Sequence, residues 1–365
     1  MPLQCGIVGL TNVGKTTLFN CISNNRAESS IYAFSATKSN IGQILVPDER
    51  LKQLEKLQTT EKVIPTTVEI VDIPGLAKGV SKGEGVGNKF LADIRNTDAL
   101  IHVLRCFDDE NLIHVEGSVD PVRDLELIDF ELQIKDLESI EKKIIKYEKL
   151  VRTGDKDAKH ILEVLIIYKE HLGNMQNART ANVSESDKMH IQDIALLTAK
   201  PVLFVCNVDE ASAVNGNNYV DAVKKAVEED NSEVLVIAAA LESDIAELET
   251  EDDKIEFLND AGLTEPGVNK LIRSAYTILN LDSFFTVGPK EVRAWTIKKG
   301  MSAPEASGVI HSDLERGFIR AEVMKFNDFI HYGSEQKVKD AGKLHVEGKK
   351  YIVEDGDILH IRFNV

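Results

Sequence analysis

The chain has 365 residues, of which 43% are hydrophobic and 28% are charged, and its formal net charge is -17. This length accommodates two or three domains, each with its own core. Phosphate binding needs clustered Lys and Arg, so the acidic total argues against nucleic acid wrapping the whole surface, and we expect no direct DNA binding. One local basic face is still compatible with this charge.

We predict a cytoplasmic protein with no membrane segment. The stretch "MPLQCGIVGL" lacks a basic region followed by a long apolar run, so no signal peptide is expected. No apolar stretch approaches the roughly 20 residues that span a bilayer. The four cysteines, Cys5, Cys21, Cys106 and Cys206, lack CxxC or CxxH spacing. This pattern indicates a reduced protein with neither disulfides nor a cysteine metal site.

Strand and helix patterns alternate along much of the chain. The spacing of apolar residues predicts a helix at residues 15–24. Short apolar runs predict buried strands at residues 3–10, 66–72, 98–107, 202–206 and 232–241. This alternation predicts an α/β fold with a mostly parallel sheet covered on both faces. The nucleotide-binding domain would consist of residues 1–128 and 197–280.

Two further blocks depart from that pattern. Between residues 129 and 196, apolar positions fall near helical spacing, and Gly154-Asp155 interrupts them. An inserted antiparallel helical hairpin that projects as a coiled-coil arm is predicted, and the alternative is two more helices of the main domain. Residues 281–365 contain short β-like runs between Gly, Asp and Pro turns, which predict a small α+β domain.

A phosphate-binding loop is predicted at Gly9–Thr16, where "GLTNVGKT" fits GxxxxGK[ST] between a strand and a helix. Glycines let backbone N–H groups close around phosphate oxygens, and a helix N-terminus adds positive potential. Lys15 should reach the β- and γ-phosphates, and the Thr16 hydroxyl should ligate Mg²⁺. The predicted nucleotide-binding residues of this loop are Asn12, Val13, Gly14, Lys15, Thr16 and Thr17.

A second motif, DxxG, is formed by Asp72 to Gly75 at the end of a predicted strand. The Asp72 carboxylate would hold Mg²⁺, and the Gly75 N–H would sense the γ-phosphate. The glycine-rich loop that follows has the composition of a mobile switch, or of an ordinary flexible loop. Many such proteins place Gln after DxxG to orient the attacking water, but this position is Leu76. Either catalysis comes from elsewhere, with His114 as one candidate, or hydrolysis is poor; alternatively His114 is an ordinary packed residue.

A polar turn follows the buried strand at Val202–Cys206. It reads Asn207-Val208-Asp209-Glu210, where a guanine-nucleotide switch protein normally has Asn-Lys-x-Asp. Taken alone, the turn is compatible with a broken guanine reader, a reader of another base, or a simple strand-to-loop junction.

Several stretches together resemble the YchF-type, or Obg-like, ATPases. They are "CGIVGLTNVGKTTLFN", "DIPGLAKGVSKGEGVGNKFL", "IHVLRCF", "NLIHVEG" and the turn at Asn207. The resemblance covers essentially the whole chain, including the helical insertion, and residues 281–365 resemble the family's TGS domain. It implies ATP hydrolysis, dependence on Mg²⁺, and binding to the ribosome or its large subunit.

The resemblance also implies roles for individual residues at the base. Glu210 is one methylene longer than the Asp that binds guanine, and Val208 replaces the Lys that packs over the base. Asn207 keeps an amide that suits the adenine edge. The loop at Ala239, Ala240 and Leu241 would line the base pocket.

Three more positions bear on catalysis. His114 falls where the family carries a histidine suspected of replacing the missing Gln. Asn12 occupies a position that holds K⁺ in related switch proteins, or it only stabilises the loop. The segment "IYAFSATKSN" at residues 31–40 departs from the family's switch I, "NYPFCTIEPN". Its Thr for Mg²⁺ is replaced by Ala36. Either Ser35 or Thr37, one place later, substitutes after a local shift, or Mg²⁺ loses this ligand.

The predicted function is a Mg²⁺-dependent ATPase that regulates ribosomes. The alternatives are an NTPase that accepts both GTP and ATP, a nucleotide-binding module that barely hydrolyses, and a metabolic nucleotide kinase. The predicted catalytic residues are Lys15, Gly75 and His114, and the predicted metal ligands are Thr16, Asp72 and Thr37.

Overall fold

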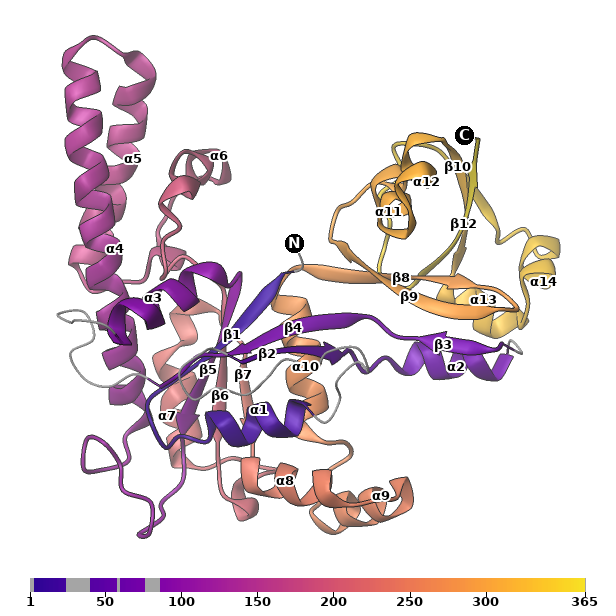
Figure 1. Cartoon of the computed structure of the whole chain (residues 1–365), viewed down its shortest axis with the longest axis horizontal. Coiled ribbons are helices and arrows are strands. Elements are labelled where there is room, and N and C mark those ends of the chain that lie inside the picture. Colours follow the sequence, from indigo (N-terminus) through magenta and orange to yellow (C-terminus); the bar gives the residue numbers. More distant parts are fainter. Residues whose placement is uncertain (1–2, 24–39, 58–59, 76–85, 365) are drawn as a thin grey trace. The chain divides into compact units, whose positions relative to one another are not determined.

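The computed structural model describes residues 3–23, 40–57, 60–75 and 86–364, and at residues 86–88 it describes the backbone only. The chain divides into two compact units, shown in Figure 1. Unit 1 comprises residues 1–42 and 69–271, and unit 2 comprises residues 43–68 and 272–365.

The sheet of unit 1 has the strand order β2-β4-β1-β5-β6-β7. Strand β1 lies between β4 and β5 and pairs with both in parallel, and β5, β6 and β7 continue the parallel ladder. The predicted α/β fold with a mostly parallel sheet is therefore confirmed. The strands are β1 (Gln4–Val8), β2 (Asn40–Leu45), β4 (Thr67–Asp72), β5 (Ala99–Arg105), β6 (Val202–Asn207) and β7 (Val234–Ile237).

The central strands β5 and β6 are mostly apolar because both faces of the sheet are covered. Every residue of β5 and β6 is buried. The helices that accompany this sheet in the chain are α1 (Lys15–Ser23), α3 (Val86–Asn96), α7 (Asn218–Ala226), α8 (Ala239–Glu247), α9 (Glu251–Asp260) and α10 (Gly267–Ile278). Short 3₁₀ turns, η4 (Glu210–Ser212) and η5 (Glu228–Asp230), flank α7.

The helical insertion is a two-helix hairpin of α4 (Pro121–Arg152) and α5 (Lys156–Gly173), which lie side by side in Figure 1. Asp120 caps α4, and its carboxylate accepts from the Arg123 N–H at 3.1 Å, with Pro121 at the first helical position. Gly154 turns the chain between the helices at φ +88°. The predicted hairpin is confirmed.

Further short elements complete the insertion. They are η2 (Ala178–Thr180), α6 (Glu185–Lys188) and η3 (Met189–Ile194). Buried Ile191 of η3 joins Leu165 and Tyr168 of α5 in one apolar cluster, so these segments share a core with the hairpin. The buried carboxylate of Asp136 on α4 accepts from Leu197 N–H and from Thr198 N–H, each at 2.7 Å. These bonds fix the point where the chain returns to the sheet.

Unit 2 is built on a second sheet with the order β11-β10-β12-β8-β9-β3. Its β8–β9 and β10–β12 pairs are antiparallel, and β12–β8 is parallel. The α+β character predicted for residues 281–365 is confirmed. The strands are β3 (Lys62–Ile64), β8 (Leu281–Val287), β9 (Glu291–Lys298), β10 (Phe318–Lys325), β11 (His345–Glu347) and β12 (Asp357–Phe363), and the helices are α2 (Glu49–Leu57), α11 (Ala303–Ile310), α12 (Ser312–Arg316), α13 (Phe326–Tyr332) and α14 (Glu335–Asp340).

One segment joins a different unit from the one the predicted boundaries gave it. Those boundaries placed residues 43–68 in the nucleotide-binding domain, but β3 pairs in parallel with β9. Helix α2 also packs within unit 2, because Leu51 and Leu54 are buried in a cluster with Phe285.

Across the described ranges, no helix combines the length and apolar character that a bilayer crossing requires.

Candidate functional site

The loop between β1 and α1 has the backbone of a phosphate-binding loop. Gly9, Asn12 and Gly14 all have positive φ, at 152°, 63° and 98°. A Cβ on Gly9 would lie 2.5 Å from the carbonyl oxygen of Val103, and one on Gly14 would lie 2.3 Å from Nδ2 of Asn207. Both glycines are therefore required by close approach as well as by their backbone conformation.

Lys15 lies beneath this loop with 6% of its surface exposed, and its ammonium donates to the carbonyl oxygen of Leu10. Burial lowers the pKa of Lys15 to about 8, and the charge of Asp72 opposes that shift. Burial also raises the pKa of Asp72, and Lys15 opposes it. The two charges thus stabilise each other in a partly desolvated position, where phosphate oxygens and a cation would find compensating partners.

The DxxG segment reaches the phosphate-binding loop. A Cβ on Gly75 would lie 2.9 Å from Nζ of Lys15 and 3.2 Å from Cγ2 of Thr11. The structure therefore brings Lys15, Asp72 and Gly75 together, as the motifs predict. Thr16 and Thr17, at the start of α1, are exposed.

Asn207, at the end of β6, links the two loops of the predicted nucleotide pocket. Its Nδ2 donates to the carbonyl oxygen of Val13 at 2.9 Å, and its Oδ1 accepts from the backbone N–H of Ala239 at 2.9 Å. Asn207 is only 4% exposed. An amide has two N–H donors, so one remains for a base. The contact with adenine stays a prediction, and the two bonds that Asn207 makes in the structure join the loops of the pocket.

The residues after Asn207 face in different directions. Val208 is buried, and its N–H donates to the carbonyl oxygen of Ile237 at 2.9 Å. Asp209 accepts from the Ser212 N–H at 2.9 Å and so caps η4, while Glu210 is exposed. On the neighbouring loop, Ala239 and Leu241 are buried and Ala240 is exposed.

The segment that carries His114 is held beside the phosphate-binding loop. Nδ2 of Asn12 donates to the carbonyl oxygen of Ile113 at 3.3 Å. Arg105, at the end of β5, is 1% exposed and donates to the carbonyl oxygens of Phe107, Asp109 and Leu112 at 3.1, 3.2 and 2.8 Å. One buried guanidinium therefore organises the loop.

Both ring nitrogens of His114 are bonded. Nδ1 accepts from the backbone N–H of Glu116 at 3.1 Å, and Nε2 lies 2.8 Å from Oδ2 of Asp124. Because a backbone N–H can only donate, Nδ1 carries no proton and Nε2 is the nitrogen that donates to Asp124. The side chain of His114 is 4% exposed. A direct catalytic role requires Nε2 to leave Asp124.

Three predicted positions are not described by the structure. They are Ala36 and Thr37 of switch I, and Leu76 after DxxG.

Sequence reasoning missed Arg105 and Asp124. Their positions carry a weak signal, a charged residue ending an apolar strand and an acidic residue in the first turn of a helix, and neither pattern names its partner.

The parallel sheet, the loop at Gly9–Thr16 and the Asn207 turn define a P-loop nucleotide-binding protein of the G-domain type. Residues 4–151 match the family described as "50S ribosome-binding GTPase", MMR_HSR1. Residues 281–364 match YchF-GTPase_C, described as "Protein of unknown function (DUF933)".

Curated relatives match over the full chain. "Ribosome-binding ATPase YchF" of Bacillus subtilis (strain 168) is 47% identical over 367 residues, which cover 100% of both chains. The protein of the same name in Escherichia coli O157:H7 is 47% identical over 365 residues, also covering 100% of both. The structure of the Schizosaccharomyces pombe YchF GTPase superimposes with a TM-score of 0.88 at 36% identity, covering 99% of this chain and 97% of that one. The chain belongs to the YchF family.

Proposed function

We propose that this chain is a Mg²⁺-dependent ATPase that works on the ribosome. The observation that carries the choice of base is the turn at the end of β6, where Asn207 is bonded to both pocket loops. Val208 is buried there and Glu210 is exposed. Neither offers what a guanine reader uses, namely a Lys over the base and an Asp on its edge.

The residues at the phosphates suit ATP with Mg²⁺. Mg²⁺ prefers hard oxygen ligands, and the Thr16 hydroxyl and the Asp72 carboxylate supply them. The ion would neutralise charge on the phosphate oxygens. Lys15 would place its ammonium at the β- and γ-phosphates after giving up the Leu10 carbonyl, and the Gly75 N–H would contact the γ-phosphate. Thr37 is the further ligand we propose from switch I.

His114 is our candidate for orienting the attacking water. Its segment contacts Asn12 of the phosphate-binding loop through Ile113. Release of Nε2 from Asp124 would free a neutral imidazole at that edge of the site, and Asp124 would remain satisfied by Arg123, whose Nη2 donates to Oδ1 at 2.9 Å. The loss of one bond by a buried histidine is a modest cost that bound nucleotide or ribosome can offset.

Asn12 is our candidate for a K⁺ site. Its Nδ2 donates to Ile113, which leaves its Oδ1 as the atom that would face a monovalent cation at the phosphates. Such a cation would supply positive charge that an arginine finger supplies in other NTPases.

The ribosome is proposed as partner because the relatives from Bacillus subtilis and Escherichia coli are named ribosome-binding ATPases. We also propose a cytoplasmic location, which a ribosomal partner supports. An NTPase that also accepts GTP is the second candidate, since the similar Schizosaccharomyces pombe protein is described as a GTPase.

Calorimetric titration with ATP and with GTP, each with Mg²⁺, separates the two proposals. We expect ATP to bind at least about tenfold more tightly, a difference of about 1.4 kcal/mol. Equal affinities would favour the dual-specificity enzyme, and tighter GTP binding would overturn the ATPase proposal.

A further inference from the structure

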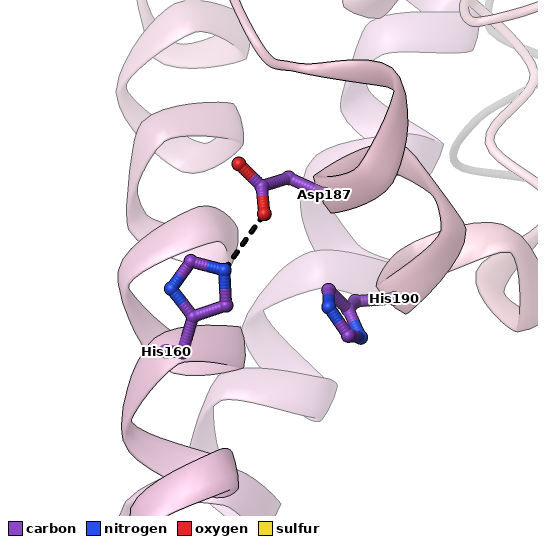
Figure 2. Close-up of side chains that lie close together, drawn as sticks. All are labelled: His160, Asp187 and His190. Atoms are coloured by element: carbon purple, nitrogen blue, oxygen red, sulfur yellow. Dashed lines mark hydrogen bonds and ion pairs between the residues drawn. The ribbon is translucent and has the colours of Figure 1, made fainter.

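Three side chains of kinds that bind metals meet within the helical insertion. His160 lies on α5, Asp187 in α6 and His190 in η3, and one ligand atom from each lies within 4.8 Å of the others. Figure 2 shows the two imidazoles and the carboxylate gathered between α5 and the α6–η3 segment. His160 lies 27 residues before Asp187 in the chain. None of the three belongs to the P-loop or to the base-reading turn.

The carboxylate is already oriented toward one histidine. Nε2 of His160 lies 2.7 Å from Oδ1 of Asp187, and the Ser184 hydroxyl donates to Oδ2 of the same carboxylate at 2.8 Å. Ser184 also caps α6, so its position is fixed by the start of that helix. Both bonds lower the pKa of Asp187, and the bond from Ser184 has the larger effect. A hydrogen bond that orients a ligating carboxylate is typical of metal sites.

His190 is placed by the helical geometry and by its backbone. It follows Asp187 by three residues, a spacing that puts two side chains on the same face of a tight helical turn. Its ring meets that of His160 edge to face, with centroids 5.6 Å apart. Its carbonyl oxygen accepts from Nζ of Lys143 at 3.2 Å, and the next residue, Ile191, is buried in the core of the hairpin. The backbone is therefore held while both rings remain exposed.

We propose that His160, Asp187 and His190 bind a divalent transition-metal ion of the zinc class. Two imidazole nitrogens and one carboxylate oxygen suit Zn²⁺, Co²⁺ or Ni²⁺, whereas Mg²⁺ and Ca²⁺ prefer oxygen ligands throughout. Tetrahedral bonds of about 2.0–2.2 Å separate ligand atoms by about 3.3–3.6 Å, so small rotations of the exposed rings complete the site. Water or a partner's side chain would take the fourth position.

A metal ion bound by these three residues would link two parts of the insertion. His160 belongs to α5, and the other two ligands belong to the α6–η3 segment that leads back to the sheet. A bound ion would tie that segment to the hairpin and reduce its freedom to move. This role is independent of nucleotide hydrolysis.

A second cluster of similar composition makes a useful contrast. Glu322, Glu335 and His360 in unit 2 also have ligand atoms within 4.8 Å of one another. There, Nη2 of Arg362 lies 2.9 Å from Oε2 of Glu322, and Arg320 approaches the other oxygen at 3.7 Å. These guanidinium groups already supply the positive charge that an ion would bring, and the set has one imidazole instead of two. The cluster in the insertion is the better site.

Titration of the full chain with Zn²⁺ tests the proposal. Excess Mg²⁺ is present, so that sites built from oxygen ligands are occupied. We expect one Zn²⁺ per chain with a dissociation constant of about 1 μM. His160→Ala and His190→Ala should each weaken binding by at least about tenfold, and Ser184→Ala, which only orients Asp187, should weaken it by about tenfold or less.

His311→Ala is the matched control. His311 is exposed beside the carboxylate of Asp313, at 3.6 Å, and so reproduces one imidazole and one carboxylate of the site. Its removal should leave Zn²⁺ binding unchanged. Far-UV circular dichroism checks that each variant folds, as expected for exposed histidines. Zn²⁺ should raise the melting temperature of the parent chain and of the His311 variant, but not of the His160 variant.

The proposal is wrong if the parent chain takes up no Zn²⁺ near one equivalent. It is equally wrong if the His160 and His190 variants bind Zn²⁺ as tightly as the parent. In either case the contact between His160 and Asp187 is an ordinary surface ion pair.

Discussion

The amide of Asn207 donates to the carbonyl oxygen of Val13 at 2.9 Å, which joins the base-reading turn directly to the phosphate-binding loop. The same side chain accepts from the Ala239 N–H. The two loops that would surround a nucleotide therefore share one buried residue. Changes at this residue should affect the whole pocket and not the base alone.

Asn207→Ala tests that linkage. Loss of both buried bonds should lower the free energy of unfolding by about 2 kcal/mol. ATP and GTP binding should weaken together, by roughly tenfold each. Asn217→Ala is the control, because Asn217 caps α7 and donates to the Cys106 carbonyl at 2.8 Å; it should cost stability without changing nucleotide affinity. A variant of Asn207 that loses only ATP affinity, with stability intact, would show that the residue reads the base.

Gly14→Ala should abolish nucleotide binding. The new Cβ would lie 2.3 Å from Nδ2 of Asn207, in a backbone conformation of φ +98° that strains any L side chain. Gly154→Ala is the matched comparison, since Gly154 has φ +88° but nothing within 4 Å of its Cβ position. It should cost about 1 kcal/mol and leave ATP affinity unchanged. Equal effects of the two substitutions on calorimetric ATP binding would contradict the close approach of Gly14 and Asn207.

ATP binding should take up a proton at alkaline pH. Burial lowers the pKa of Lys15 from its ordinary value of 10.5 to about 8, and phosphates would raise it again. Affinity should therefore fall as pH rises above about 8, and binding should take up protons near pH 9 but not, from this group, near pH 7. Calorimetry in two buffers of different ionisation enthalpy measures the uptake. Equal proton uptake at both pH values would rule out Lys15 as its source.

The lowered pKa of Lys15 also affects the stability of the nucleotide-free chain. Because the folded pKa of Lys15 lies below the unfolded one, the charged amine costs stability below pH 8. That cost declines as pH rises toward the unfolded value, so this group alone makes the free energy of unfolding increase with pH in that window.

His114→Ala should lower the turnover number for ATP by about 100-fold, as expected for loss of a group that acts on the attacking water. ATP affinity should change little, since His114 touches Asp124 and Glu116 in the structure and not the phosphate-binding residues. Asp124→Asn keeps an acceptor for Nε2 and should slow turnover much less. Equal slowing by the two variants would assign His114 to anchoring the loop.

Local motifs could be predicted from the sequence because their chemistry depends on neighbours in the chain. The loop at Gly9–Thr16, the DxxG segment and the turn at Gly154 belong to this kind. The structure brings Lys15 and Gly75 together as their order along the sheet predicts.

Contacts between different structural elements could not be predicted in the same way. Asp124 and His114 meet because α4 begins where the histidine loop ends, and the cap at Asp120 decides that start. Residues 43–68 join the second sheet because β3 pairs with β9, far along the chain. Neither the His114–Asp124 contact nor the β3–β9 pairing produces a recognisable pattern of residues in the sequence, because each depends on how whole elements pack.

Steady-state turnover of ATP and GTP, each with and without ribosomes, tests the central claim most directly. The account predicts that kcat/KM for ATP exceeds that for GTP by at least about tenfold, about 1.4 kcal/mol of transition-state discrimination, and that ribosomes raise ATP turnover. A larger kcat/KM for GTP, with ATP turnover indifferent to ribosomes, would contradict it.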